Sequence, residues 1–272
     1  TVVLLAYVAD YFATKREVKI RFIESLLPLW LPVFLIVSLI LPANLSTALL
    51  LLFMVTVVAF LGGYPLKYLL SMLGAAILGL VIFVLLAKAY PDAFPNRVDT
   101  WMSRIESFSG NGTNTTDYQI ERAKAAVAVG GIVGIGAGKS MMKNVLPQSS
   151  SDFIYAIIAE EYGMIGALFL LFLFLLLLLR ILVNANKSES FFGQLLILAM
   201  GIPIVTQAFI NMGVAVALLP VTGQPLPLIS SGGTSLWMTF FAVGIILSVS
   251  ANRKAAIEEN ESNPLATLSD EA

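Results

Sequence analysis

The side chains that could do chemistry in this sequence are carboxylates, lysines, arginines and hydroxyls, because its 272 residues include neither Cys nor His. Disulfides, thiol nucleophiles, imidazole bases and an ordinary zinc site are therefore excluded. Proton transfer would fall to Asp, Glu, Lys, Arg or Tyr, and a bound metal would be a hard ion with oxygen ligands, such as Mg²⁺. The groups of interest gather in one polar segment, residues 91–151, and directly after it.

Asp152 closes the polar run Ser149-Ser150-Ser151-Asp152, which immediately precedes a strongly apolar stretch. A Ser or Asp at such a place is usually a helix N-cap. Asp152 has a second interpretation, since the helix dipole favours its ionised carboxylate, which could then accept a proton. We expect Lys143 to lie beside it.

Glu160 and Glu161 are set into the apolar stretch that follows. On a helix, Glu160 would lie about 80° around from Asp152 and roughly 12 Å deeper, whereas Glu161 would fall on the opposite face. Acids inside a membrane span normally face protein or water. A buried structural contact could explain either residue. We prefer that explanation for Glu161 and keep Glu160 as a candidate substrate contact.

A glycine-rich run, residues 130–140 (GGIVGIGAGKS), is similar to a phosphate-binding P-loop, but Val133 stands where that motif needs its first glycine. No strand precedes the run, so we reject nucleotide binding. A flexible re-entrant turn is one interpretation. The other is a cradle of backbone N–H groups for a lipid-borne diphosphate, with Lys139, Ser140 and Lys143 beside it.

Two further segments supply polar candidates. Thr116 and Gln119 have the spacing of a capping box that would start a helix through Val129, so Gln119 is interpreted either as a cap or as a substrate contact. Residues 219–227 contain three prolines and cannot form a regular helix, and such backbone in a membrane needs protein or a cavity around it. Residues 230–235 (SSGGTS) then open the last apolar stretch, as a capping turn or as the wall of a substrate cavity. The candidates here are Thr222, Ser230, Gly232 and Gly233.

The elements that must position these groups are membrane-spanning helices. Hydrophobic residues make up 58% of the chain and charged residues 12%, against about 25% charged in a soluble domain. Lipid must therefore be the solvent for much of the chain, and no basic surface suggests nucleic acid. The predicted fold class is an all-α, polytopic transmembrane bundle with one large extracytoplasmic loop. In addition to a partial helix at residues 1–13, spans are expected at residues 26–41, 46–61, 66–90, 153–182, 191–219 and 232–250.

Four regions follow from this pattern. Residues 1–90 hold the partial helix and three spans, and residues 91–151 form the large loop. Residues 152–250 hold three spans with an outer re-entrant turn, and residues 251–272 are expected to be a disordered cytoplasmic tail. The first apolar run is too short for a span, which needs about 20 residues, so we expect the chain to be a fragment of a longer protein.

The short loops orient the bundle, because Lys and Arg accumulate in short loops on the cytoplasmic side. Alternating the spans puts nine of the 16 basic residues on one side, which we take as cytoplasmic. Residues 91–151 and 220–231 then face outward together.

Three blocks of the sequence resemble signatures of the SEDS proteins, the bacterial shape, elongation, division and sporulation glycosyltransferases. The blocks are residues 134–143 (GIGAGKSMMK), residues 146–154 (LPQSSSDFI) continued by 160–163 (EEYG), and residues 219–233 (LPVTGQPLPLISSGG). Their order and spacing cover nearly the whole chain. The wording of residues 221–223 is more similar to the division-type member of the family than to the elongation-type. The resemblance also implies that the first helices of the fold are missing here.

The resemblance implies polymerisation of glycan strands from lipid II on the outer face of the bacterial inner membrane, with the active loop in the periplasm. Asp152 matches the essential Asp of the family, the base for the acceptor sugar hydroxyl. Lys143 and Arg97 match cations that would hold the donor diphosphate, with a divalent cation such as Mg or Mn as a further candidate. One inverting displacement would release undecaprenyl diphosphate. The implied partners are lipid II, membrane lipid, a class B penicillin-binding protein transpeptidase and division-complex proteins.

The sequence departs from the family pattern in places. Residues 41–47 (LPANLST) lack the acid of the usual block, Gln148 replaces a Glu and Ser231 replaces a Tyr. Two other classes of function stay open beside an enzyme. A lipid II flippase would need a polar pathway through the spans, and a division-complex scaffold would tolerate replacement of Asp152 by Asn.

Overall fold

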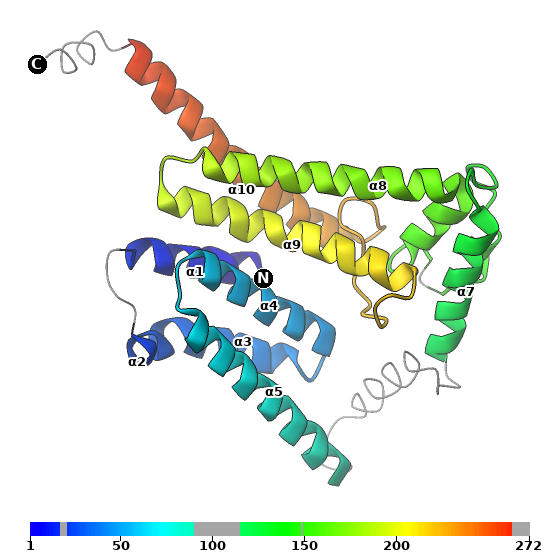
Figure 1. The fold of residues 1–272 in the computed structure, drawn as a ribbon, viewed down its shortest axis with the longest axis horizontal. Coiled ribbons are helices and arrows are strands. Elements are labelled where there is room, and N and C mark those ends of the chain that lie inside the picture. Colours follow the sequence, from blue (N-terminus) through cyan, green and yellow to red (C-terminus); the bar gives the residue numbers. More distant parts are fainter. Residues whose placement is uncertain (17–20, 90–114, 148, 263–272) are drawn as a thin grey trace, which may run out of the picture.

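The computed structural model describes residues 1–16, 21–89, 115–147 and 149–262, and in these ranges every regular element is helical, as the sequence predicts (Figure 1). The elements are α1 (Val2–Thr14), α2 (Phe22–Ser25), a π-helical turn (Leu26–Trp30), α3 (Leu31–Ile40), α4 (Leu45–Leu61), α5 (Leu66–Ala89), α7 (Thr115–Gly130), a 3₁₀ turn (Met142–Asn144), α8 (Ile154–Asn186), α9 (Phe191–Ala215) and α10 (Gly233–Ser262).

The apolar helices fall where the hydrophobic runs predict them. Five stretches in the described ranges are long and apolar enough to cross a membrane: Phe22–Ile40, Leu66–Leu86, Ile154–Asn186, Phe191–Ala215 and Gly233–Ala251. The helix Leu45–Leu61 is equally apolar but has only 17 residues. The chain is thus a multi-pass membrane protein. The expected end of the fifth span at residue 219 is wrong, because α9 ends at Ala215.

α9 is the central helix of the bundle, and α1, α4, α8 and α10 all pack against it. Small residues on α9 let these neighbours approach closely, as is usual for helices that associate in lipid. At Gly201, an added Cβ would come within 2.5 Å of the Ile181 side chain of α8.

The turn between α4 and α5 holds the first helices together through Tyr64, which is buried. Its hydroxyl forms a hydrogen bond of 2.7 Å with the Ser25 hydroxyl and accepts one of 3.2 Å from Trp30 Nε1. In the same turn, Gly62 makes room for Phe12 of α1, since a Cβ there would lie 2.5 Å from ring atom Cγ. These contacts fix α1, α2 and the π-helical turn against the end of α4.

The two ends of the bundle differ in character. The C-terminus of α1 and the α4–α5 and α8–α9 turns lie at one end (left in Figure 1), and the Arg16 guanidinium stacks 4.5 Å from the Phe191 ring centroid there. The other end holds α7 and the segment between α9 and α10. The described part of the large loop and the proline-rich segment therefore share one end, opposite the basic turns, as the alternation of spans predicts.

α8 bends sharply at Gly163, which has φ 67° and ψ −168°. The bend separates a short helix, residues 154–162, from the long span that follows. The glycine-rich run docks into this bend through backbone hydrogen bonds in both directions. The bonds are Ile135 N to Glu160 O (3.1 Å), Gly136 N to Glu161 O (3.0 Å), Met164 N to Gly131 O (2.9 Å) and Ile165 N to Ile132 O (3.2 Å).

Close backbone approach explains the glycines of this run. An added Cβ at Gly134 would lie 2.2 Å from the Glu161 carbonyl oxygen, and one at Gly163 would lie 2.4 Å from the Ile132 carbonyl oxygen. The run is therefore held against α8 by its backbone. The N–H groups of Gly134, Ile135 and Gly136 donate to backbone carbonyls, so they do not form the diphosphate cradle that was the second interpretation of this run.

The last helix runs past the predicted membrane boundary. α10 continues to Ser262, so the prediction of a disordered tail is wrong for residues 251–262, and residues 263–272 lie outside the described ranges. The acidic composition suggested disorder, but the segment is also rich in Ala, Glu, Lys and Arg, which have high helix propensity. It extends a helix that is already nucleated in the bundle.

Candidate active site

The segment that carries Asp152 is held by three polar contacts from two distant parts of the chain. The contacts are Ser231 N to Ser150 O (3.0 Å), the Ser230 hydroxyl to Ser151 O, and Asn211 Nδ2 to Asp152 O (2.7 Å). Asp152 itself is partly exposed and lies one residue before Phe153, the N-cap position of α8. The carboxylate predicted from the sequence is thus carried by backbone that α9 and the α9–α10 segment fix in place.

Ser230 lies inside the protein and uses both capacities of its hydroxyl. The oxygen accepts from Leu226 N at 2.7 Å and the hydrogen is donated to the Ser151 carbonyl. The structure therefore gives Ser230 a positioning role in place of the predicted substrate contact. Gly232 N donates to the Ser230 carbonyl at 2.8 Å, whereas Gly233 faces open space at the start of α10.

Asn211 of α9 is a buried residue that sequence reasoning missed. Its Nδ2 donates to Asp152 O and also to Gln224 O, at 2.8 Å, so one amide joins the Asp152 segment to the proline-rich segment. One turn earlier, Gln207 Nε2 donates to Pro225 O at 3.1 Å. Two amides four residues apart in an apolar span are unusual, and that spacing is the signal that could have revealed them.

Lys143 lies in the 3₁₀ turn with an exposed side chain and a backbone held on both sides. Its N–H donates to Ser140 Oγ at 3.0 Å, and its carbonyl accepts from Ser149 Oγ at 2.8 Å. Because Ser149 precedes Asp152 by three residues, the second bond ties the lysine turn to the Asp152 segment. The structure thus brings the predicted cation and the predicted carboxylate into one neighbourhood.

Of the two acids, Glu160 makes the buried structural contact that we had preferred for Glu161. Glu160 is 0% exposed, and its carboxylate accepts from the Ser140 hydroxyl and from Met141 N at 3.1 Å. Glu161 is partly exposed, with Oε1 at 3.4 Å from Ser140 N. The prediction that Glu160 contacts substrate is therefore wrong, because the docked glycine-rich run brings a polar loop over that face of the helix.

The remaining candidates are spread around this neighbourhood. Lys139 is exposed, in a turn where its N–H donates to Gly136 O at 3.2 Å. Gln119 is half-buried on α7, which begins at Thr115, one residue before the predicted cap Thr116. Thr222 is half-buried in the proline-rich segment. Arg97 lies outside the described residues, as does the side chain of Thr116, so the capping box stays a prediction.

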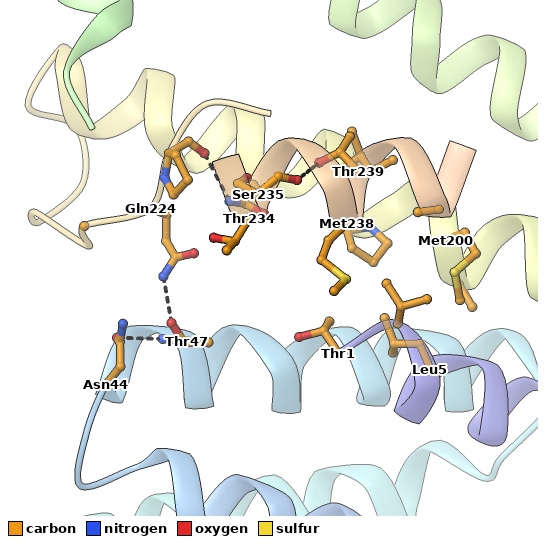
Figure 2. A pocket seen from close by; sticks show the side chains of 18 residues that line it. Thr1, Leu5, Asn44, Thr47, Met200, Gln224, Thr234, Ser235, Met238 and Thr239 are labelled. Atoms are coloured by element: carbon orange, nitrogen blue, oxygen red, sulfur yellow. Dashed lines mark hydrogen bonds between the residues drawn. The ribbon is translucent and has the colours of Figure 1, made fainter. Parts of the chain in front are cut away.

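A cavity of about 560 Å³ opens between α1, α4, α9, α10 and the proline-rich segment (Figure 2), within the usual size range of ligand sites. Gln224 spans it at one end, where its Nε2 donates to Thr47 Oγ1 at 2.9 Å. Of residues 230–235, Thr234 and Ser235 line the cavity, whereas the candidates Ser230, Gly232 and Gly233 are not among its lining residues. Asp152 does not line the cavity; it is joined to the lining through the Asn211 bridge to Gln224.

The described residues that line this cavity carry no charged side chain. Its polar groups are amides and hydroxyls, including Asn44, whose Oδ1 accepts from Thr47 N at 3.1 Å and caps α4. Met200 and Met238 supply flexible apolar surface on the opposite side. Such a lining suits an uncharged, largely apolar guest.

No group of three or more Asp or Glu side chains is placed to hold a metal ion in the described part of the chain, and Glu160 is already engaged with Ser140 and backbone N–H groups. Because Mg²⁺ is often held by one or two carboxylates together with substrate phosphates, a divalent cation such as Mg or Mn stays a prediction.

The fold and the site define a multi-pass helical membrane protein with a polar catalytic-type cluster at one end of the bundle. Residues 1–255 match the model of the FtsW, RodA and SpoVE family of cell cycle proteins. The chain belongs to this family, as the signature blocks predicted.

Individual relatives agree with the family assignment. A protein named probable peptidoglycan glycosyltransferase FtsW from Enterococcus hirae is 32% identical over 93% of this chain. A chain from a structure titled as the structural coordination of polymerization and crosslinking by a peptidoglycan synthase complex superposes with a TM-score of 0.72 at 28% identity, over 92% of this chain and 68% of that one. Rod shape determining protein RodA of Thermus thermophilus superposes with a TM-score of 0.61 at 25% identity, over 93% of this chain and 64% of that one. This chain spans 64% of the length of the Enterococcus protein.

Proposed function

We propose that the protein is a peptidoglycan glycosyltransferase that polymerises lipid II into glycan strands during cell division. The observation that carries the proposal is that hydrogen bonds hold the backbones of Lys143 and Asp152, so that the segments bearing a cation and a carboxylate are tied to each other. Membership of the FtsW, RodA and SpoVE family supports it, and so does the name of the Enterococcus relative.

The proposed reaction is one displacement at the anomeric carbon of the donor sugar. The Asp152 carboxylate accepts the proton of the acceptor sugar hydroxyl as its oxygen forms the new glycosidic bond. The bond from the anomeric carbon to the donor diphosphate breaks, and undecaprenyl diphosphate leaves. Lys143, with Arg97 as a second candidate, stabilises the negative charge that develops on the leaving group. An α-linked donor then gives a β-linked product.

The cavity and the polar cluster suit different parts of a lipid-linked substrate. The diphosphate needs cations, and it would find Lys143 and Lys139 on the loop. The cavity lining is uncharged and includes Leu5, Met200 and Met238, so we assign it to the polyprenyl chain of a lipid substrate. The lipid would enter from the bilayer between the helices and present its head group to the outer end.

We infer that the end holding α7 faces the periplasm and that the protein lies in the bacterial inner membrane. The basic turns at the opposite end support this orientation. A class B penicillin-binding protein transpeptidase is the proposed partner, together with other division-complex proteins, because the similar solved structure comes from a complex that couples polymerization to crosslinking.

A lipid II flippase is the alternative that the cavity itself raises. A flippase would have to carry a diphosphate across the bilayer, and charged groups inside spans mark such pathways. The side chains that line the cavity within the described ranges carry no charge, which favours the polymerase. A non-catalytic scaffold would need neither the cavity nor the anchored Asp152.

The test uses the full-length protein with its transpeptidase partner, reconstituted in nanodiscs with fluorescent lipid II, and separates the products on a gel. Glycan strands made by the wild type, but not with the transpeptidase alone, would support the polymerase. Flipping of lipid II in liposomes without strand synthesis would favour the flippase. The absence of both activities, with binding to the partner retained, would favour the scaffold.

A further inference from the structure

Glu160 is a fully buried carboxylate that the proposed reaction leaves without a role. It projects from the short helix of residues 154–162 into the base of the lysine turn. The Ser140 hydroxyl donates to Oε2, and Met141 N donates to Oε1 at 3.1 Å. Met142 N lies 3.4 Å from both oxygens. A buried carboxylate is tolerated only with such partners.

The Ser140 hydroxyl links Glu160 to the backbone of Lys143. While it donates to Glu160, its oxygen accepts from Lys143 N at 3.0 Å. The lysine backbone is thus held from one side by Glu160 through Ser140, and from the other by Ser149. No other carboxylate of the described residues makes an equivalent set of contacts with this turn; Glu161 reaches only Ser140 N, at 3.4 Å.

Asp152 and Glu160 lie near the two ends of one short helix, so this helix connects the proposed base to the anchor of the lysine turn. Asp152 lies two residues before the first helical residue, Ile154, and Glu160 lies in the last turn before the bend at Gly163. The helix therefore fixes the distance between the proposed base and the point where the lysine turn is attached. A catalytic group that is displaced by about 1 Å can lose on the order of 100-fold in rate.

We propose that Glu160 is a positioning residue that holds Lys143 at the place where it meets the donor diphosphate. Glu160 does not touch substrate; it acts through Ser140 and the backbone of the lysine turn. The inference rests on the proposed function, because it assumes that Lys143 stabilises the leaving group. It predicts that removing the Glu160 anchor matters only while the lysine side chain is present.

The experiment is a double-mutant cycle on the full-length protein with its partner, measuring kcat and KM for lipid II polymerisation. The variants are Glu160→Gln, Lys143→Ala, the double variant, and Glu161→Gln as the matched control. Glu160→Gln should lower kcat/KM about tenfold in the wild-type background and less than about twofold in the Lys143→Ala background, because a positioning residue and its target couple non-additively. Glu161→Gln should stay within about twofold of wild type. Ser140→Ala removes only the relaying hydroxyl and should show the same coupling to Lys143→Ala, so it carries the test if Glu160→Gln does not fold.

Three results would overturn the inference. Equal effects of Glu160→Gln with and without the lysine side chain would reduce Glu160 to a structural residue. Wild-type activity in Glu160→Gln would remove even that role, and full activity in Lys143→Ala would leave no cation to position. Failure of the proposed function is a separate outcome, since the wild-type protein itself would then make no glycan strands.

Discussion

Replacing Gly134 by Ala should detach the glycine-rich run from the bend in α8. Gly134 has φ +85°, and a left-handed conformation costs an Ala about 1–2 kcal/mol. Its Cβ would also lie 2.2 Å from the Glu161 carbonyl oxygen, so the run must move away from that backbone. The movement would break the bonds from Ile135 N and Gly136 N, each contributing about 0.5–1.5 kcal/mol.

Gly138 is the matched control for this substitution. It has φ +75°, and nothing lies within 4 Å of an added Cβ. Gly138→Ala therefore carries only the conformational cost, so Gly134→Ala should destabilise the docked run by about 1–3 kcal/mol more. That difference corresponds to about a fivefold to 150-fold change in the opening equilibrium.

Hydrogen–deuterium exchange of the two variants in nanodiscs measures that opening directly. Peptides covering residues 131–140 and 159–166 should exchange about fivefold or more faster in Gly134→Ala than in Gly138→Ala, while peptides from α9 stay unchanged. Equal exchange in the two variants would refute the conclusion that close backbone contact at Gly134 pins the run to α8.

Two further substitutions test the anchoring inside the bundle. Asn211→Leu leaves the Asp152 carbonyl without its buried donor and should reduce the stability of the fold by about 1–3 kcal/mol. We expect a lower thermal unfolding midpoint together with reduced polymerisation. An unchanged midpoint would contradict the bridging role of Asn211. Tyr64→Phe removes the hydroxyl that joins Ser25 and Trp30. It should reduce the stability of the fold by about 1–2 kcal/mol and so lower the unfolding midpoint, while kcat/KM per folded protein stays unchanged. A loss of turnover in the folded protein would contradict this purely structural role.

The spans and the irregular proline-rich segment could be predicted because their signals are local. Twenty apolar residues in a row need no partner to indicate a span, and three prolines prevent a helix wherever they lie. Asp152 and Lys143 could also be predicted as candidate site residues from local signals, since each lies in a motif that is continuous in the sequence.

The bend at Gly163 and the burial of Glu160 could not be predicted, because their causes are distant in the sequence. A glycine in an apolar run gives no sign of a bend until Gly134 is seen packed against it. Glu160 and Glu161 differ by one residue, and helical geometry separates their faces without saying which face is covered. The answer depends on Ser140, which lies 20 residues away in the sequence.

The most direct test of the account compares glycan-strand synthesis by the wild type, Asp152→Asn and Asp10→Asn in the full-length protein with its transpeptidase partner. Asp10 lies exposed on α1 and provides the same chemical change away from the polar cluster. Lipid II binding is measured in parallel for all three proteins. We predict strands from the wild type and from Asp10→Asn, and none from Asp152→Asn although lipid II remains bound. Equal synthesis by Asp152→Asn would contradict the assignment of Asp152 as the catalytic base.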